Sequence, residues 1–170
     1  MAAGNTYEAI AEQTLGSAAA SVTFSSIPGT YTDLVLVVTP ASSAQKDVDI
    51  RLNGDTGTNY SHTVLSGNGT SAISSRTSSN ASAYITYYAA TNTTLGNSVF
   101  IVNFMNYSNT TTYKTMLARA NNASTGVDAA VALWRNTAAI TSIQIGPNLQ
   151  QGTNTWSTGS TFSLYGILAA

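Results

Sequence analysis

The chain lacks cysteine, and its 170 residues include one histidine and three prolines. The absence of cysteine excludes disulfide bonds, thiolate metal sites and cysteine nucleophiles. One histidine cannot form a histidine pair around a metal. We interpret that residue, His62, as a surface or hydrogen-bonded structural residue, because it lies on a polar strand after a turn. We expect no catalytic residues, no bound cofactor and no metal, and we interpret the chain as non-enzymatic.

Charge is also scarce. Charged residues make up 8% of the chain and the net charge is −1, whereas about 25% charged residues is typical. No cluster of Lys and Arg provides a footprint for nucleic acid. Because the net charge is so small, copies of the chain repel one another only weakly. We therefore expect the chain to act within an assembly.

Long apolar runs are missing too. The longest, Leu34–Val38, is far shorter than the ~20 residues of a membrane-spanning helix. The start, Met1-Ala2-Ala3-Gly4-Asn5, has no basic region followed by an apolar stretch, so no signal peptide is expected. We therefore expect no membrane partner.

What the chain does have is apolar and polar residues in alternation. Val48, Ile50 and Leu52 alternate with Asp47, Asp49 and Arg51, and a period of two places the two sets on opposite faces of a strand. We expect the apolar set to face the core and the charged set to face water. Asp47, Asp49 and Asp55 could in principle hold Ca²⁺, but Arg51 offsets them, so a solvated face is favoured.

Similar patterns recur along the chain, mostly at spacings of 8 to 15 residues, with turns rich in Gly, Asn, Ser and Thr. Such spacing favours a sandwich or barrel over alternating strands and helices. The prediction is an all-β, antiparallel β-sandwich, jelly-roll-like, with a flexible N-terminal arm over residues 1–6 and a single domain over residues 7–170. The segment Ser66–Ser82 is expected to be an exposed loop. The predicted strands are Tyr7–Leu15, Ala20–Ser25, Asp33–Thr39, Lys46–Leu52, Asn59–Leu65, Ala83–Ala89, Ser98–Asn106, Tyr113–Ala120, Val127–Trp134, Ile140–Ile145 and Thr161–Leu168.

Two predicted strands, around Leu34–Val38 and Val99–Val102, are apolar on both faces. Such runs indicate strands with both faces covered. A loop could cover the outer face, or another subunit could. With the near-zero net charge, the second alternative favours a homo-oligomer, and a trimer is our preferred state.

Aromatic residues provide the candidate partner contacts. Tyr87 and Tyr88 follow Tyr84, Tyr107 flanks a polar hairpin, and Trp156 lies in a segment of small polar residues. Exposed aromatic rings framed by Ser and Asn suit protein or sugar contacts. We predict partner contacts by Tyr87, Tyr88, Tyr107 and Trp156. The alternative is that these rings close the ends of the sandwich.

Three stretches carry a resemblance to a known group of proteins: Val22–Leu34 with its turn Ile27-Pro28-Gly29-Thr30, then Arg51–Ser61, and the terminal Phe162–Ile167. Together they resemble small β-rich virion structural proteins of tailed bacteriophages, including phages of cyanobacteria. The resemblance implies a decoration, or cement, protein that binds the major capsid protein or other virion proteins. It also implies a place on the capsid surface after synthesis in the bacterial cytoplasm. A tail or fibre component, or a glycan-binding receptor tip, is the alternative.

Overall fold

The computed structural model describes residues 6–168, and these residues contain strands and no helix. The predicted arm over residues 1–6 therefore lies, apart from Thr6, outside the described residues. The strands are β1 (Tyr7–Thr14), β2 (Val22–Phe24), β3 (Asp33–Thr39), β4 (Val48–Leu52), β5 (Tyr60–Gly67), β6 (Ala72–Asn80), β7 (Ala83–Tyr84), β8 (Ser98–Met105), β9 (Lys114–Asn122), β10 (Gly126–Trp134), β11 (Ile143–Pro147) and β12 (Thr161–Ile167).

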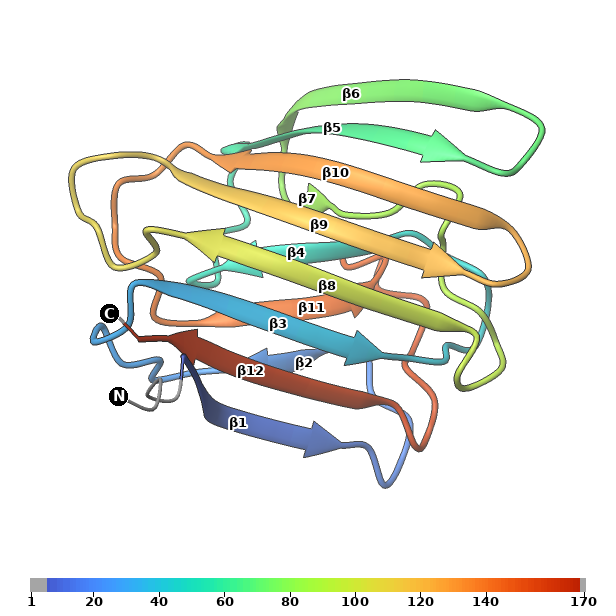
Figure 1. Cartoon of the computed structure of the whole chain (residues 1–170), viewed down its shortest axis with the longest axis horizontal. Coiled ribbons are helices and arrows are strands. Elements are labelled where there is room, and N and C mark those ends of the chain that lie inside the picture. The colour runs from blue at the N-terminus through green and yellow to red at the C-terminus, as the bar shows by residue number, and fades with distance from the viewer. Residues whose placement is uncertain (1–5, 169–170) are drawn as a thin grey trace, which may run out of the picture.

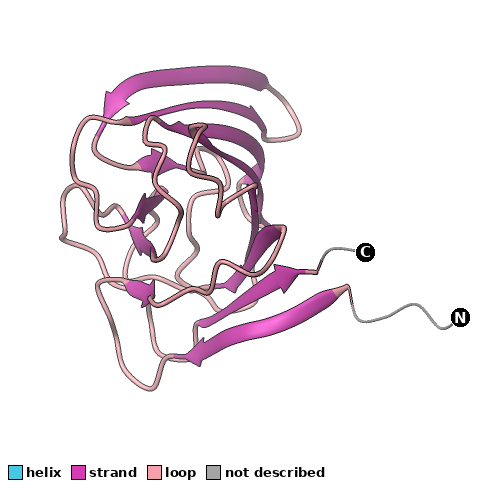
Figure 2. Ribbon diagram, turned by 90° about the vertical axis from the view of Figure 1, so that its left-hand side faces the viewer, coloured by secondary structure: helices cyan, strands magenta, loops and turns pink. Residues whose placement is uncertain are grey.

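The strands form two sheets. The large sheet has eight strands in the order β1-β12-β3-β8-β9-β10-β5-β6, and the small sheet has four in the order β2-β11-β4-β7. All neighbouring strands are antiparallel. Figure 1 shows the large sheet in front of the small one, and Figure 2 shows the two layers from the side. The fold is an antiparallel, jelly-roll-like β-sandwich, which confirms the predicted fold class.

The core lies between the two sheets and follows from the alternation along each strand. On β3, Leu34, Leu36 and Val38 are fully buried, while Val37 between them is half-buried. The prediction that the apolar set of β4 faces inward is confirmed. The inward-facing residues of both sheets include Leu34, Leu36, Val38, Val48, Ile50, Leu52, Phe100, Phe104, Trp134, Ile143 and Ile145.

The predicted loop over Ser66–Ser82 is wrong, because most of it is strand. β6 occupies Ala72–Asn80 and pairs with β5 at one edge of the large sheet. Its side chains are mostly exposed. An edge strand of this kind buries few side chains, so it needs no apolar face. Its residues are mostly Ser and Thr, and a search for alternating apolar and polar residues could not detect it.

The predicted exposure of Asp49 is also wrong. Its carboxylate is fully buried and accepts hydrogen bonds from Ser82 Oγ at 2.7 Å and from the backbone N–H of Leu149 at 2.8 Å. Arg51 donates to the Leu149 carbonyl at 3.2 Å, so the segment after β11 lies over this face of the small sheet. Periodicity assigns side chains to a face, but it does not show whether a distant segment covers that face.

Burial of this face changes its acid chemistry. Burial raises the pKa of Asp49 to about 6, although the hydrogen bonds from Ser82 and Leu149 work in the opposite direction. Burial, and then the negative charge of Asp49, raise the pKa of Asp47 to about 6 as well. The face expected to be plain solvated surface therefore holds two carboxyl groups that are costly to ionise.

Most predicted strands differ from the observed ones by one or two residues at an end, and β7 and β11 differ most. β7 ends at Tyr84, well before the expected Ala89. The chain leaves the sheet because the backbone N–H groups of Tyr87, Tyr88 and Ala89 all turn to the carboxylate of Asp128. β11 runs from Ile143 to Pro147, later than predicted.

Candidate protein-binding face

The outer face of the large sheet, which points away from the small sheet, carries exposed apolar side chains. On β10, Ala130, Ala132 and Trp134 point into the core, so the residues between them point outward. One of these, Val131, is 54% exposed, and its cross-strand neighbour Leu117 on β9 is 39% exposed. An antiparallel sheet with one face in water normally presents polar residues on that face, so the exposed apolar side chains of this strand pair are unusual.

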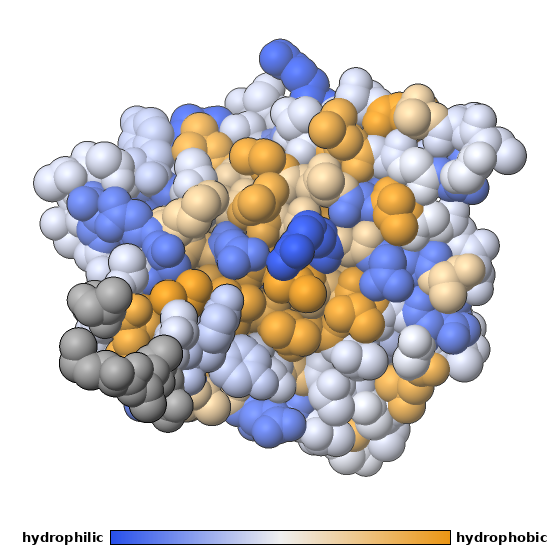
Figure 3. All heavy atoms as spheres, viewed as in Figure 1, coloured by the Kyte–Doolittle hydropathy of each residue, from blue (hydrophilic) through white to orange (hydrophobic). Residues whose placement is uncertain are grey.

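The apolar side chains continue across neighbouring strands. Val37 on β3 lies opposite Ile101 on β8, and Ala129 on β10 lies opposite Leu65 on β5. Figure 3 shows hydrophobic residues gathered across the middle of this face. We call this set the apolar patch: Val37, Leu65, Val99, Ile101, Leu117, Val127, Ala129, Val131, Leu133 and Tyr165. Contiguous exposed apolar surface of this kind marks interaction sites.

One basic residue stands inside the patch. Arg119 on β9 is exposed, and its cross-strand partners are Ile101 on one side and Ala129 on the other. Arg119 and Asn103 also line a shallow hollow of about 310 Å³ with Tyr7, Val35, Val37, Ile101 and Tyr165. An arginine framed by apolar groups can pair with a carboxylate of a partner while the surrounding area is buried.

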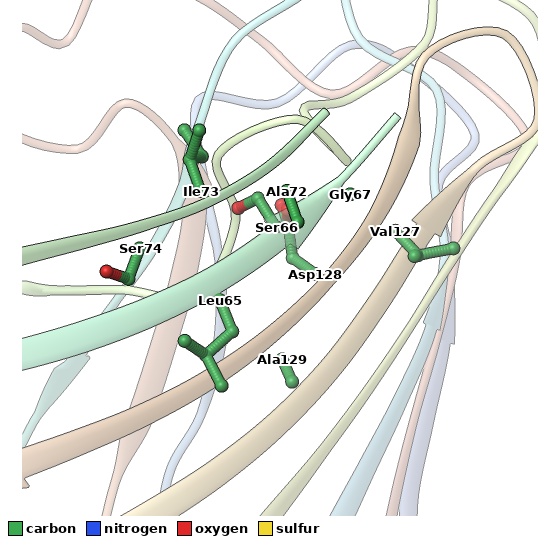
Figure 4. A pocket seen from close by; sticks show the side chains of 9 residues that line it. All are labelled: Leu65, Ser66, Gly67, Ala72, Ile73, Ser74, Val127, Asp128 and Ala129. Atoms are coloured by element: carbon green, nitrogen blue, oxygen red, sulfur yellow. The ribbon is translucent and has the colours of Figure 1, made fainter. Parts of the chain in front are cut away.

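A larger hollow, about 660 Å³, lies where β5, β6 and β10 meet. Leu65 and Ala129 lie next to each other on adjacent strands, with Val127 farther along β10 (Figure 4). The lining is mostly apolar and contains no basic side chain. The hollow extends the apolar patch toward the β6 edge of the sheet.

Two of the predicted contact residues are not on the surface. Tyr107 and Trp156 are both fully buried, so their expected exposure is wrong. The hydroxyl of Tyr107 donates to the Pro28 carbonyl, and Trp156 Nε1 donates to the Ile145 carbonyl at 3.2 Å. These rings pack within the fold, as the alternative interpretation held, because each polar end finds a backbone acceptor inside.

The other two predicted contact residues remain available. Tyr87 is 46% exposed and Tyr88 is half-buried, and their rings meet edge to face at 5.4 Å between centroids. The carboxylate of Asp128 fixes their backbone, with a 2.8 Å hydrogen bond from the Ala89 N–H and further bonds from both tyrosine N–H groups. Contact of Tyr87 and Tyr88 with a partner stays a prediction. No local pattern in the sequence indicated that Asp128 positions these two tyrosines.

His62 differs from its expected setting. It is buried, its ring lies 5.2 Å from the ring of Tyr84, and its Nδ1 has no hydrogen-bond partner among residues 6–168. Burial lowers the pKa of His62. The ring is therefore held as a neutral, largely apolar group in the sandwich.

The three aspartates considered for calcium do not share a site. Asp55 accepts hydrogen bonds from Trp134 Nε1 at 2.7 Å and Asn59 Nδ2 at 2.8 Å, whereas Asp49 is bound to Ser82 and the Leu149 backbone. Burial opposes ionisation of Asp55, but its hydrogen bonds outweigh that effect and lower its pKa. Within the described range, no group of three or more acidic or His side chains is arranged to hold a metal ion.

Sequence reasoning did not identify the apolar patch as a site. The sequence predicts a strand here, but the two sets of side chains on its opposite faces are both apolar. One set is Ala129, Val131 and Leu133, and the other is Ala130, Ala132 and Trp134. Period two alone could not tell which set faces outward. The two-face apolar runs on β3 and β8 were the available signal, and they do lie under the patch. Among residues 6–168, no loop covers Val37 and Ile101, which border an open hollow.

Comparisons with known proteins add little. No model of a known protein family matches the chain, and no curated protein matches it. Among solved structures, a Caenorhabditis elegans galectin, LEC-6, is 13% identical over 93% of this chain and 96% of its own, with a TM-score of 0.38. A mutant of alginate lyase Aly36B is 8% identical over 86% and 79% with a TM-score of 0.27, and a human SPRY domain is 7% identical over 91% and 96% with a TM-score of 0.24. Likenesses this distant say nothing about what the chain binds. In the described part of the chain, no helix could span a membrane.

Proposed function

We propose that this chain is a non-enzymatic structural protein of a virion, a capsid decoration protein that binds the major capsid protein lattice through the apolar patch. The observation that carries the proposal is the exposed apolar area on the large sheet with Arg119 inside it. The resemblance of three stretches to phage virion proteins supplies the identity of the partner.

The physical basis is the composition of that face. An apolar patch with one charge can bind a protein surface because burying apolar area is favourable, by roughly 25 cal/mol per Å² before the entropic cost of association is subtracted. A decoration protein meets many identical copies of its partner, so several modest contacts combine into firm attachment. We further propose that the chain works as a homo-oligomer, with a trimer favoured, which would multiply these contacts.

The test is co-sedimentation of the purified chain with capsids of the phage that encodes it. Val131→Asp places a carboxylate in the middle of the patch and should lower capsid binding at least tenfold. Leu95→Asp is the matched control, because Leu95 is 45% exposed but lies in the segment before β8, outside the patch. Equal binding by both variants and the unaltered chain would refute attachment through this face.

A tail component or a glycan-binding tip is the competing role. Sugar-binding faces use exposed aromatic platforms, and two of the four aromatic residues predicted for contacts, Tyr107 and Trp156, are buried. Binding to a glycan array by the isolated chain, without binding to capsids, would favour this alternative.

A further inference from the structure

The two edges of the large sheet are long and open. β1 and β6 are the terminal strands of the sheet, and each has a strand neighbour on one side among the described residues. They are eight and nine residues long, and most of their side chains are exposed. An open edge of this length offers a row of unpaired backbone donors and acceptors to another strand.

The direction of the strands allows one edge to join the other. The eight strands alternate in direction from β1 to β6, so the two edge strands run in opposite senses. When a second copy is placed beside the first with the same face outward, its β1 therefore lies antiparallel to the first copy's β6. Such a junction continues the sheet with the same hydrogen-bonding pattern.

The charges on the two edges are complementary. β1 carries Glu8 and Glu12, and β6 carries Arg76. Glu12 pairs with Ser163 and Arg76 pairs with Thr63, both of which alternate with buried core residues, so both charged side chains project from the outer face. Opposite charges on directly facing residues of one sheet face stabilise a strand pair.

The regular parts of both edges coincide with these charges. A register shift interrupts β1 between Ala9 and Ala11, and another interrupts the pairing of β6 between Tyr60 and His62 of β5. The remaining segments, 11–14 and 72–77, are regular and contain Glu12 and Arg76. When Glu12 is placed opposite Arg76, residues 11–14 align with residues 74–77. In this register, outer-face residues of β1 lie opposite outer-face residues of β6, and inner-face residues lie opposite inner-face residues.

From these observations we propose that copies of this chain associate head to tail, with the β1 edge of one copy pairing antiparallel with the β6 edge of the next. This deepens the self-association proposed above and does not depend on the capsid role. Pairing of two β6 edges would give Arg76 no opposite charge to face, because β6 contains no acidic residue. A head-to-tail contact builds a ring when its rotation closes, which includes a trimer.

The absence of cysteine allows a direct test by cross-linking. Glu12→Cys and Arg76→Cys variants are prepared separately and mixed at high micromolar concentration under mild oxidation. Directly opposite strand residues lie within disulfide reach, so the mixture should form disulfide dimers at least tenfold faster than either variant alone. Thr110→Cys, an exposed loop residue mixed with Glu12→Cys, gives the background rate.

Charge reversal provides the second measurement. Glu12→Arg or Arg76→Glu alone should weaken self-association about two- to fivefold in sedimentation velocity, and the double variant should restore it. Both sites are exposed, and thermal melts check that the variants fold. A mixed cross-linking rate no higher than that with Thr110→Cys would overturn the proposal, and so would predominant Arg76→Cys homodimers. Because these assays use the chain alone, failure of capsid binding leaves their outcome unaffected.

Discussion

Replacing Asp49 by Asn should stabilise the protein at neutral pH. The carboxyl group is buried and its pKa is raised from 3.8 to about 6 in the folded state. At pH 7 the folded protein must keep this group ionised, which costs about 3 kcal/mol relative to the unfolded chain. The asparagine amide can still accept from the Leu149 N–H, and its NH₂ group can donate to Ser82 Oγ in place of the bond that Ser82 donates to Asp49. The variant therefore removes the charge and keeps a hydrogen bond to each of these two groups.

The sign of the pH dependence follows from the raised pKa. The neutral acid contributes stability that is complete below pH 3.8 and is lost as pH rises through about 6. The free-energy advantage of Asp49→Asn should therefore be largest, about 1–3 kcal/mol, at pH 7 and above, and should shrink toward zero near pH 4. Denaturant melts at pH 4, 5, 6, 7 and 8 measure it. The difference between the variant and the unaltered chain is the quantity to follow, because ionisable groups far from Asp49 affect both proteins alike. Asp47 contributes to the difference in the same direction, because the variant removes the negative charge that helps to raise its pKa.

Two controls complete the experiment. Glu12→Gln removes an exposed carboxylate and, in melts at a protein concentration too low for self-association, should show no such pH-dependent advantage. Asp49→Ser removes the acceptor of the Leu149 N–H, so it should be less stable than Asp49→Asn by about 1–3 kcal/mol. If Asp49→Asn proved less stable than the unaltered chain at pH 7, the ionised carboxylate would be stabilised by its surroundings, and the reasoning from burial would be refuted.

Three further predictions concern the core, a turn and metals. Ile50→Ala should lower the free energy of unfolding by about 2–5 kcal/mol in denaturant melts, because Ile50 is fully buried; a loss below 1 kcal/mol would contradict its place in the core. Gly126→Ala should destabilise by more than about 1 kcal/mol, because its φ is 153° and a Cβ would lie 2.3 Å from the Gly67 carbonyl oxygen. Gly16→Ala, with no atom within 4 Å of its Cβ, should be nearly neutral in the same melts. Millimolar Ca²⁺ or a chelator should leave the melting temperature unchanged, and an upward shift of several degrees with Ca²⁺ would reveal a site that binds the native state.

The sequence predicted the central strands closely, because their side chains alternate between a buried and an open environment. The prediction for β3 matched both of its ends, Asp33 and Thr39. The sequence did not predict β6, because its Ser and Thr residues show no alternation of apolar and polar side chains. It also did not predict the end of β7, which depends on Asp128 some 40 residues away. Structure that depends on contacts between distant segments cannot be predicted from a local sequence pattern.

The site was harder to predict than the fold for the same reason. Tyr107 and Trp156 lie in polar segments typical of surface aromatics, but backbone carbonyls inside the fold accept their hydrogen bonds. These carbonyls belong to Pro28, 79 residues from Tyr107, and to Ile145, 11 residues from Trp156. Asp49 looked solvated until the segment around Leu149 was placed above it. On β10, both faces are apolar, and the packing of the two sheets alone decides that Val131 is the exposed one.

The pairing of β1 with β12 also shapes how the chain folds. Tyr7 lies opposite Ile167, so β1 gains its partner only after strands β2 to β11 have been synthesised. Contacts of such long sequence separation form slowly, and on the ribosome β1 must wait while the rest of the sheet forms. The start of β1 and the end of β12 lie side by side, as Figure 1 shows. A short linker between them, with new ends cut into the exposed turn between β5 and β6, should therefore give a circular permutant in which β1 and β12 are adjacent in sequence and pair early.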